Sequence, residues 1–171
     1  ILEQSAAQFQ TDKQFAAPLV QAVSSSKVRL LLSCSGQKSG GTANGVRPYM
    51  PLGDLRTQLL YPSEGTLGHL PDEELREILS RFGLGELPDR FEGGFEAVQD
   101  WSRVLSLGEQ QRLAAARCLT TRPRLVVLDE ATSALPLPAE RLVYEQFAAD
   151  ERIEGYVSVG HRVSLSQYHD V

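Results

Sequence analysis

The feature that most constrains the fold is an unbroken apolar run that ends in two acidic residues. Residues 125–128 read Leu-Val-Val-Leu, and Asp129 and Glu130 follow directly. An apolar run without polar alternation is typical of a strand that is buried on both faces of a parallel sheet. Residues 156–159 read Tyr-Val-Ser-Val and are interpreted as a second buried strand, which is followed by Gly160 and His161. Helical patterns before and between these strands predict an α/β fold with a parallel core sheet.

Other segments carry helical spacing together with residues that start or stop helices. Acids open one of them before Gly83, and Ser106, a good N-cap residue, precedes another. A short buried strand is predicted over residues 27–32, whereas residues 1–23 and 85–103 lack a sustained period. Helices are therefore predicted over residues 53–60, 71–81, 107–119 and 139–149.

Charge, apolar runs and cysteine content exclude several classes of protein. Lys and Arg number 17 against 22 Asp and Glu, a net charge of −5, so we expect no nucleic-acid partner bound through bulk charge. The apolar runs are far shorter than the roughly 18 residues of a membrane-spanning helix, so no transmembrane segment is expected in this chain. Cys34 and Cys118 have no C-x-x-C spacing, which favours a reducing compartment without a cysteine metal site. The chain opens at Ile1 without a signal sequence, and we expect it to be a fragment.

The polar residues that end the two strands are candidates for a functional site. Adjacent parallel strands bring their carboxyl ends to one rim, where open sheets bind their ligands. Asp129, Glu130 and His161 would supply a metal-ordering carboxylate, a base and a γ-phosphate contact, which suits phosphoryl transfer. Taken alone, an acid pair is equally typical of a solvated strand end, and a single histidine is often structural.

Residues 105–112 read LSLGEQQR and open a helix with a glycine-containing turn. Such a turn offers backbone N–H groups and the helix dipole to an anion, although ordinary capping explains it as well. The longer run LSLGEQQRLAAARCLTTRPRLVVLDEATSAL, residues 105–135, resembles the signature helix and Walker B strand of an ATP-binding cassette (ABC) ATPase. RPYMPLGDLRTQLLYP at residues 47–62 and SVGHR at 158–162 resemble the subfamily D half-transporters and their bacterial relatives.

The resemblance implies a P-loop NTPase fold of the ABC type, with ATP and Mg²⁺ as ligands. Ser106, Gly108 and Glu109 would contact the ATP that is bound to a partner cassette. Asp129 would hold Mg²⁺ through water, while Glu130 would polarise the attacking water and His161 would touch the γ-phosphate. The pair Asp100-Trp101 also resembles the family, although Trp101 is equally explained as a buried aromatic anchor.

The chain departs from the family pattern at the phosphate loop. G-x-x-x-x-G-K-[ST] is expected after the first strand, because closely spaced N–H groups must wrap the phosphates. Residues 33–39 read SCSGQKS instead, so the loop is shortened and lacks two glycines, and only Lys38 and Ser39 remain to bind phosphate and Mg²⁺. Val46 stands where the family has glutamine, and Pro136 where many members have aspartate. We therefore expect a fold that is incomplete on its N-terminal side.

These observations divide the chain into three predicted parts. Residues 1–46 are interpreted as a remnant of the N-terminal core with a degenerate phosphate loop. Residues 47–110 are interpreted as the Q-loop region and helical subdomain ending in the signature motif, and residues 111–171 as the Walker B and H-loop core.

The predicted function is ATP binding and hydrolysis that powers transmembrane transport through a composite dimer site. A second cassette, in a homodimer or heterodimer, and a fused transmembrane domain are the expected partners, at the cytosolic or stromal face of a membrane. The alternative is a non-catalytic cassette that only associates with a partner cassette. A soluble ABC protein of DNA repair or translation would bring coiled-coil or tandem cassette sequence, which this chain lacks.

Overall fold

Three parallel strands form the sheet of the computed structural model, which describes residues 30–33, 47–62, 70–121 and 123–169. The strands are β1 (Leu30–Ser33), β2 (Leu125–Asp129) and β3 (Gly155–Val159), and they lie in the order β1-β2-β3. In the register of the Cα atoms, Ser33 lies beside Leu128 and Asp129 lies beside Val159. The predicted α/β fold with a parallel sheet is confirmed.

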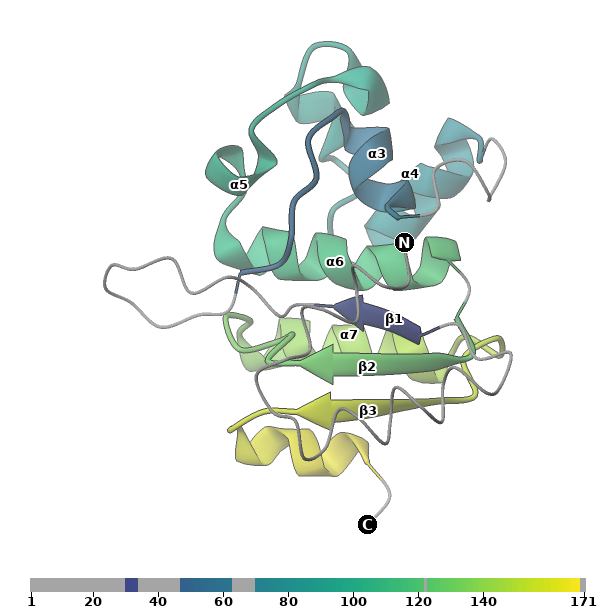
Figure 1. The fold of residues 1–171 in the computed structure, drawn as a ribbon, viewed down its shortest axis with the longest axis vertical. Helices are drawn as coiled ribbons and strands as arrows, with labels where there is room; N and C mark the ends of the chain where they lie inside the picture. The colour runs from purple at the N-terminus through teal and green to yellow at the C-terminus, as the bar shows by residue number, and fades with distance from the viewer. Residues whose placement is uncertain (1–29, 34–46, 63–69, 122, 170–171) are drawn as a thin grey trace.

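One long helix separates the sheet from a group of smaller helices (Figure 1). This helix, α6 (Leu107–Thr121), packs on β1 on one side and on the small helices on the other. A further helix, α7 (Leu137–Ala148), lies behind the sheet in Figure 1. The remaining elements are short, namely α3 (Leu55–Leu60), α4 (Asp72–Arg81), η1 (Pro88–Arg90), η2 (Gly94–Glu96), α5 (Trp101–Val104) and η3 (Val163–Tyr168).

Helix α4 begins and ends where its sequence predicts. Three acids occupy its first turn, where they complement the positive end of the helix dipole. At its other end the Leu84 N–H donates to the Leu79 carbonyl at 2.8 Å, and the Gly83 N–H donates to the Ser80 carbonyl at 3.0 Å. Gly83 takes a φ of +67°, the left-handed conformation that this C-terminal motif requires and that glycine adopts without strain.

The core forms where α6 meets α3, α4 and the sheet. Leu113 and Leu119 of α6 are fully buried together with Leu59 and Leu75, and each buried leucine contributes roughly 1.5–3 kcal/mol. Trp101 is only 1% exposed, and its Nε1–H donates to the Gly53 carbonyl at 2.9 Å. This agrees with an anchoring role for the tryptophan.

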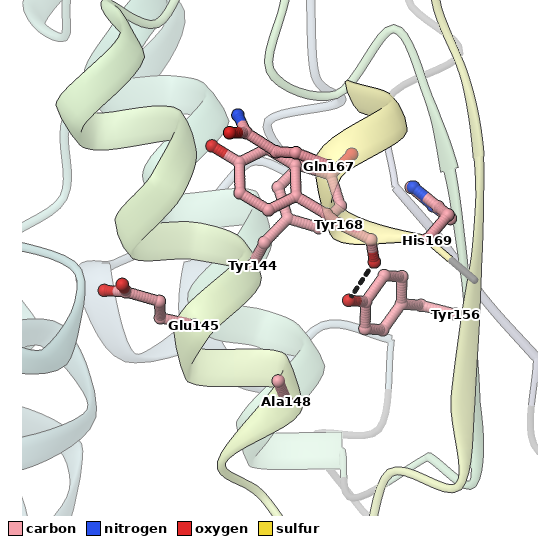
Figure 2. A pocket seen from close by; sticks show the side chains of 7 residues that line it. All are labelled: Tyr144, Glu145, Ala148, Tyr156, Gln167, Tyr168 and His169. Carbon is pink, nitrogen blue, oxygen red and sulfur yellow. Dashed lines mark hydrogen bonds between the residues drawn. The ribbon is translucent and has the colours of Figure 1, made fainter. Parts of the chain in front are cut away.

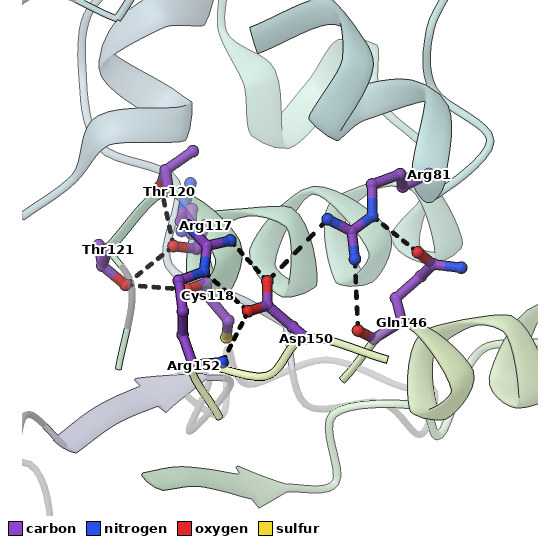
Figure 3. A network of polar contacts seen from close by, with 8 residues as sticks. All are labelled: Arg81, Arg117, Cys118, Thr120, Thr121, Gln146, Asp150 and Arg152. Atoms are coloured by element: carbon purple, nitrogen blue, oxygen red, sulfur yellow. Dashed lines mark hydrogen bonds and ion pairs between the residues drawn. The ribbon is translucent and has the colours of Figure 1, made fainter. Parts of the chain in front are cut away.

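Two buried polar groups tie the layers together. The Arg117 guanidinium of α6 donates to the Tyr49 carbonyl at 2.6 Å and to Gln58 Oε1 of α3 at 3.2 Å. Figure 3 shows Asp150, just after α7, between the guanidinium groups of Arg152 and Arg81. Arg152 makes a two-pronged contact with Asp150, at 2.7 Å and 2.6 Å, whereas Arg81 of α4 lies 4.0 Å away.

The predicted elements recur, and they differ from the prediction in burial and in several bounds. Helix α3 begins two residues later than predicted, at Leu55, and α6 ends two residues later, at Thr121. β3 is not buried on both faces, because Val157 and Val159 are 41% and 58% exposed. Only the opposite face of β3 is covered by α7, where the Tyr144 and Ser158 hydroxyls lie 2.8 Å apart. Helix α7 begins at Leu137, two residues before the prediction, because prolines fit the first turn of a helix. Residues 85–103, predicted to be irregular, contain the short helical turns η1, η2 and α5.

Two other expectations concern the ends of the chain and the membrane. Residues 1–23 and the first half of the predicted strand at 27–32 lie outside the described residues, whereas residues 30–32 belong to β1. Among the residues that the structure describes, every helix is too short or too polar to cross a bilayer.

Candidate functional site

The carboxyl ends of the three strands meet at one rim of the sheet. The Glu130 N–H donates to the Val159 carbonyl at 2.9 Å, which extends the pairing of β2 with β3 by one residue. The strand register also places Ser33, the first residue of the shortened phosphate loop, beside Leu128. The rim therefore brings together the start of that loop, the acid pair and the segment that carries His161. Lys38 and Ser39 themselves lie outside the described residues.

The structure places Glu130 and His161 next to each other at this rim. His161 Nε2 lies 3.3 Å from Glu130 Oε1, and the histidine side chain is 96% exposed while the Glu130 side chain is 22% exposed. Glu130 has a backbone φ of +50°, which is uncommon for a residue with a Cβ atom. The partly buried Glu130 carboxylate thus lies against the exposed His161 imidazole. This arrangement suits general acid–base catalysis on a bound water or phosphate ester.

Asp129 is the second carboxylate of the rim. Partial burial raises the pKa of Asp129, and the negative charge of Glu130 raises it further. A bound cation would offset both effects, and carboxylate oxygens are suitable ligands for Mg²⁺. The described residues contain no cluster of three or more metal-binding side chains. This is compatible with Mg²⁺, which usually takes only one or two carboxylates and completes its shell with water and phosphate oxygens.

The start of α6 forms a reciprocal capping box. The Glu109 N–H donates to Ser106 Oγ at 3.3 Å, while the Ser106 N–H donates to Glu109 Oε2 at 2.8 Å. Arg90 donates to the other carboxylate oxygen of Glu109 at 2.5 Å. Burial opposes the charged form of Glu109, but the hydrogen bonds from Arg90 and Ser106 outweigh it and lower the pKa. The Glu109 side chain is thus engaged within the chain, and the predicted N-cap at Ser106 is confirmed.

Gly108 lies against the loop that follows β2. A Cβ atom at this position would lie 3.5 Å from Leu135 Cδ2, which is an ordinary contact distance. The signature turn of α6 and the loop after the acid pair are therefore neighbours in the fold.

A partly buried network that the sequence did not reveal supports the same loop. The Arg162 guanidinium donates to the Ser133 carbonyl at 2.9 Å and to the Leu135 carbonyl at 2.6 Å. It also pairs at 3.2 Å with Glu140 of α7, which is completely buried and accepts a hydrogen bond from Ser164 at 2.6 Å. Each partner is distant in sequence, so spacing along the chain carries no signal of this network.

Gln111 supports the loop from the side of α6. It is 1% exposed, and its side-chain amide contacts Ser133 and Ala134. The sequence marks it only as one of two consecutive glutamines in the signature helix.

A hollow of about 270 Å³ lies between α7, β3 and the end of η3, away from Glu130 and His161 (Figure 2). Tyr144 of α7 stacks on Tyr168 of η3 with ring centres 4.4 Å apart, and the Tyr156 hydroxyl donates to the Tyr168 carbonyl at 2.6 Å. None of the predicted site residues that the structure describes lines it. We interpret it as a gap in the packing of η3 on α7. The space beneath Glu130 and His161 is only about 10 Å³, so the part of the rim that the structure describes encloses little volume.

An acid pair and a histidine at the carboxyl rim of a parallel sheet, beside a capped helix N-terminus, define an α/β domain of the nucleotide-binding class. The sequence profile described as "ABC transporter" matches residues 9–133, which is most of the chain. The chain belongs to the ABC transporter family, as an ATP-binding domain.

Similar proteins include members of subfamily D. The chain is 46% identical over 123 residues to an uncharacterized ABC transporter ATP-binding protein of Synechocystis sp., covering 72% of this chain and 18% of that protein. It is 40% identical over 148 residues to the chloroplastic ABC transporter D family member 2 of Arabidopsis thaliana, covering 72% and 20%. It is 40% identical over 129 residues to the human ATP-binding cassette sub-family D member 3, covering 72% and 19%. The chain thus spans about a fifth of the length of these relatives, and the resemblance to subfamily D is confirmed.

A solved structure supports the fold. A bacterial Atm1-family ABC exporter with ATP bound superposes with a TM-score of 0.55 at 24% sequence identity, covering 67% of this chain and 20% of that chain. The predicted ABC-type fold is therefore confirmed.

Proposed function

We propose that this chain binds and hydrolyses MgATP as the ATPase domain of an ABC half-transporter. The observation that carries the proposal is the 3.3 Å approach of His161 Nε2 to Glu130 Oε1 at the carboxyl rim of the sheet. Family membership supports it, because domains of this family bind ATP, usually with Mg²⁺.

The rim residues divide the chemistry among them. When bound, Mg²⁺ would neutralise charge on the β- and γ-phosphate oxygens. Asp129 would hold the cation through water, and Glu130 would polarise the water that attacks the γ-phosphate. His161 would contact the γ-phosphate, which its high exposure permits. Lys38 would reach the phosphates of the same ATP, and Ser39 would be a further ligand of Mg²⁺.

The signature turn would serve the second site of a cassette dimer. Ser106, Gly108 and Glu109 would face the ATP of a partner cassette, because the free N–H groups of a helix N-terminus attract phosphate. To contact ATP with its side chain, Glu109 would have to leave Arg90 or Ser106.

The expected partners and location follow from the half-transporter proposal. We propose a second cassette and a fused transmembrane domain as partners, at the cytosolic or stromal face of a membrane, with ATP hydrolysis powering transport. Residues 47–110 would form the helical subdomain and residues 111–171 the core, although α6 runs continuously across their boundary.

A second candidate is a cassette that associates with a partner without hydrolysing ATP. Residues 33–39, SCSGQKS, favour it, because the loop lacks the glycines that allow backbone N–H groups to wrap a phosphate.

Binding of a fluorescent ATP analogue with Mg²⁺, measured together with phosphate release from ATP, separates the two candidates. For an ATPase, Lys38→Ala should weaken binding about tenfold or more, through loss of a charged hydrogen bond. Glu130→Gln should retain binding and slow phosphate release about a hundredfold or more. Lys13→Ala, which removes another lysine, should match the wild type. If the wild type and all variants bind no nucleotide, the non-hydrolysing candidate replaces the ATPase.

A further inference from the structure

The backbone of Glu130 is held in an uncommon conformation by its surroundings. Its φ of +50° lies in the left-handed region, and such a conformation persists in a non-glycine residue only where the neighbouring structure fixes it. The Glu130 N–H donates to the Val159 carbonyl at 2.9 Å, and the Glu130 carbonyl accepts from the Ser133 N–H at 3.1 Å. The first contact secures Glu130 to β3, and the second closes the turn that follows it.

One side chain of α6 contacts this same turn at several points. Gln111 Nε2 donates to Ser133 Oγ at 3.1 Å and makes a long contact of 3.5 Å with the Glu130 carbonyl. Gln111 Oε1 accepts the Ala134 N–H at 3.0 Å. Gln111 is only 1% exposed, so water cannot easily replace these partners, and the turn has to keep its place for the amide to remain satisfied.

We propose that Gln111 is a positioning residue that holds the turn after β2, so that the Glu130 carboxylate stays against His161. This inference rests on the proposed ATPase function, to which it adds a residue that does not touch the nucleotide. Gln111 lies three residues after Gly108 on α6, which is continuous from Leu107 to Thr121. The same helix therefore carries the turn proposed to face the partner's ATP and the amide that orients the chain's own Glu130. A shift of the signature turn would reach Glu130 through Gln111.

Gln110 provides a matched control for Gln111. It is also 1% exposed, but its Nε2 donates to the Ser102 and Leu105 carbonyls and not to the turn after β2. Methionine has a similar length and fills the space without hydrogen bonds. Gln111→Met should remove the contacts to the turn, and Gln110→Met should leave them in place. Ser133→Ala removes one partner of Gln111 from the other side and tests the contact without changing α6.

Amide hydrogen exchange measures the turn directly. In Gln111→Met we expect the Ala134 and Ser133 amides to exchange about tenfold faster than in the wild type, since an internal hydrogen bond is lost. Ser133→Ala should accelerate the Ala134 amide to a smaller extent. Gln110→Met should leave both amides unchanged, and the Val127 amide in β2 should stay protected in every variant. Unchanged exchange at both turn amides in Gln111→Met and Ser133→Ala would overturn the proposal.

Steady-state hydrolysis of MgATP tests whether Gln111 acts through Glu130. We expect Gln111→Met to lower kcat about tenfold with little change in KM, because the side chain positions the base and does not bind ATP. In the Glu130→Gln background the same substitution should cause no further loss. An equal loss in both backgrounds would contradict positioning. If the wild-type chain releases no phosphate, the proposed function fails, and exchange at Ala134 still decides whether Gln111 holds the turn.

Discussion

Ser106 performs a measurable structural task besides its proposed contact with a phosphate. Its hydroxyl accepts the Glu109 N–H at 3.3 Å, and its own N–H donates to the Glu109 carboxylate at 2.8 Å. Ser106→Ala removes the first of these contacts, so we expect it to lower the free energy of unfolding by about 1 kcal/mol. Urea unfolding monitored by circular dichroism measures the change. Ser102→Ala removes a hydroxyl that donates to the exposed Asp100 carboxylate at 2.6 Å, and it should have a smaller effect. Equal losses of unfolding free energy in Ser106→Ala and Ser102→Ala would contradict a stabilising cap at Ser106.

Asp150 makes the stability of the chain depend on pH. Hydrogen bonds from Arg152 hold the pKa of Asp150 below its ordinary value of 3.8, although burial opposes this shift. Because the folded pKa is lower than the unfolded one, the charged carboxylate adds stability above the unfolded pKa, and this is lost as pH falls through the folded pKa. We expect Asp150→Asn to cost about 2 kcal/mol at pH 7 and progressively less below pH 4. Urea unfolding of the wild type and Asp150→Asn at pH 7 and at pH 3 tests this expectation.

An exposed ion pair serves as the control for Asp150. Asp89 pairs with Arg76 at 2.7 Å, and both side chains are open to solvent. Asp89→Asn should therefore destabilise the chain less than Asp150→Asn at pH 7, because water screens exposed pairs. A cost for Asp150→Asn that is the same at pH 7 and pH 3 would contradict the assignment of the pH dependence to this carboxylate.

At the scale of residues, the sequence pointed to the chemical groups of the candidate site but not to the residues that support them. Asp129, Glu130 and His161 could be predicted as candidates because each lies within two residues of the end of an apolar run, which is a local signal. Gln111 could not, because its partner Ser133 lies 22 residues away and only the fold brings them together. The capping of Ser106 by Glu109 was predictable because its partners are three residues apart.

At the scale of elements, an ion pair with one buried partner joins the residue before η3 to α7. Glu140 is fully buried and pairs with Arg162 at 3.2 Å. Arg162→Met would leave the Glu140 carboxylate buried without its cation. We expect a loss of about 2 kcal/mol in the free energy of unfolding, less than for a fully buried pair, because the Arg162 side chain is 36% exposed. The double variant Arg162→Met with Glu140→Met should recover part of that loss, because it removes the unpaired charge as well. Chemical denaturation of the wild type, Arg162→Met, Glu140→Met and the double variant gives the coupling. Losses that simply add would contradict the pairing.

The prediction of elements was accurate where each element carried its own end signals. Helix α4 was placed by its first-turn acids and Gly83, and β2 by its apolar run. The burial of β3 was predicted wrongly, because apolar sequence alone does not distinguish a strand covered on both faces from one covered by α7 on a single face. Helix α7 begins two residues earlier than predicted because a proline can either end the preceding segment or occupy the first turn of a helix. Here the proline occupies the first turn.

At the scale of the whole molecule, the proposed composite site predicts association that depends on ATP. We expect Glu130→Gln with MgATP to sediment at about twice the mass of the chain, because nucleotide that is not hydrolysed would bridge two cassettes. Gly108→Ala added to this variant should abolish the larger species, since a methyl group would keep the backbone from a phosphate. The fold accepts that methyl group, whose nearest contact would be Leu135 at an ordinary 3.5 Å. Sedimentation velocity with and without MgATP measures the outcome.

Two results of this experiment would contradict the composite site. One is association that is the same without nucleotide, and the other is association that persists in the Gly108→Ala variant. Thermal unfolding of the Gly108→Ala chain without nucleotide serves as the control, because it should match the wild type and so exclude damage to the fold.

The burial of α6 bears on how this sequence can vary among descendants of a common ancestor. Nearly every residue from Gln110 to Thr121 is buried, whereas the first turn of the helix is partly open to solvent. Selection for packing alone would therefore preserve most of this helix even in a lineage that had stopped hydrolysing ATP. Persistence of the helix across species would then be weak evidence of activity. Retention of Ser106 and Gly108, together with Glu130 and His161, would be the more informative record.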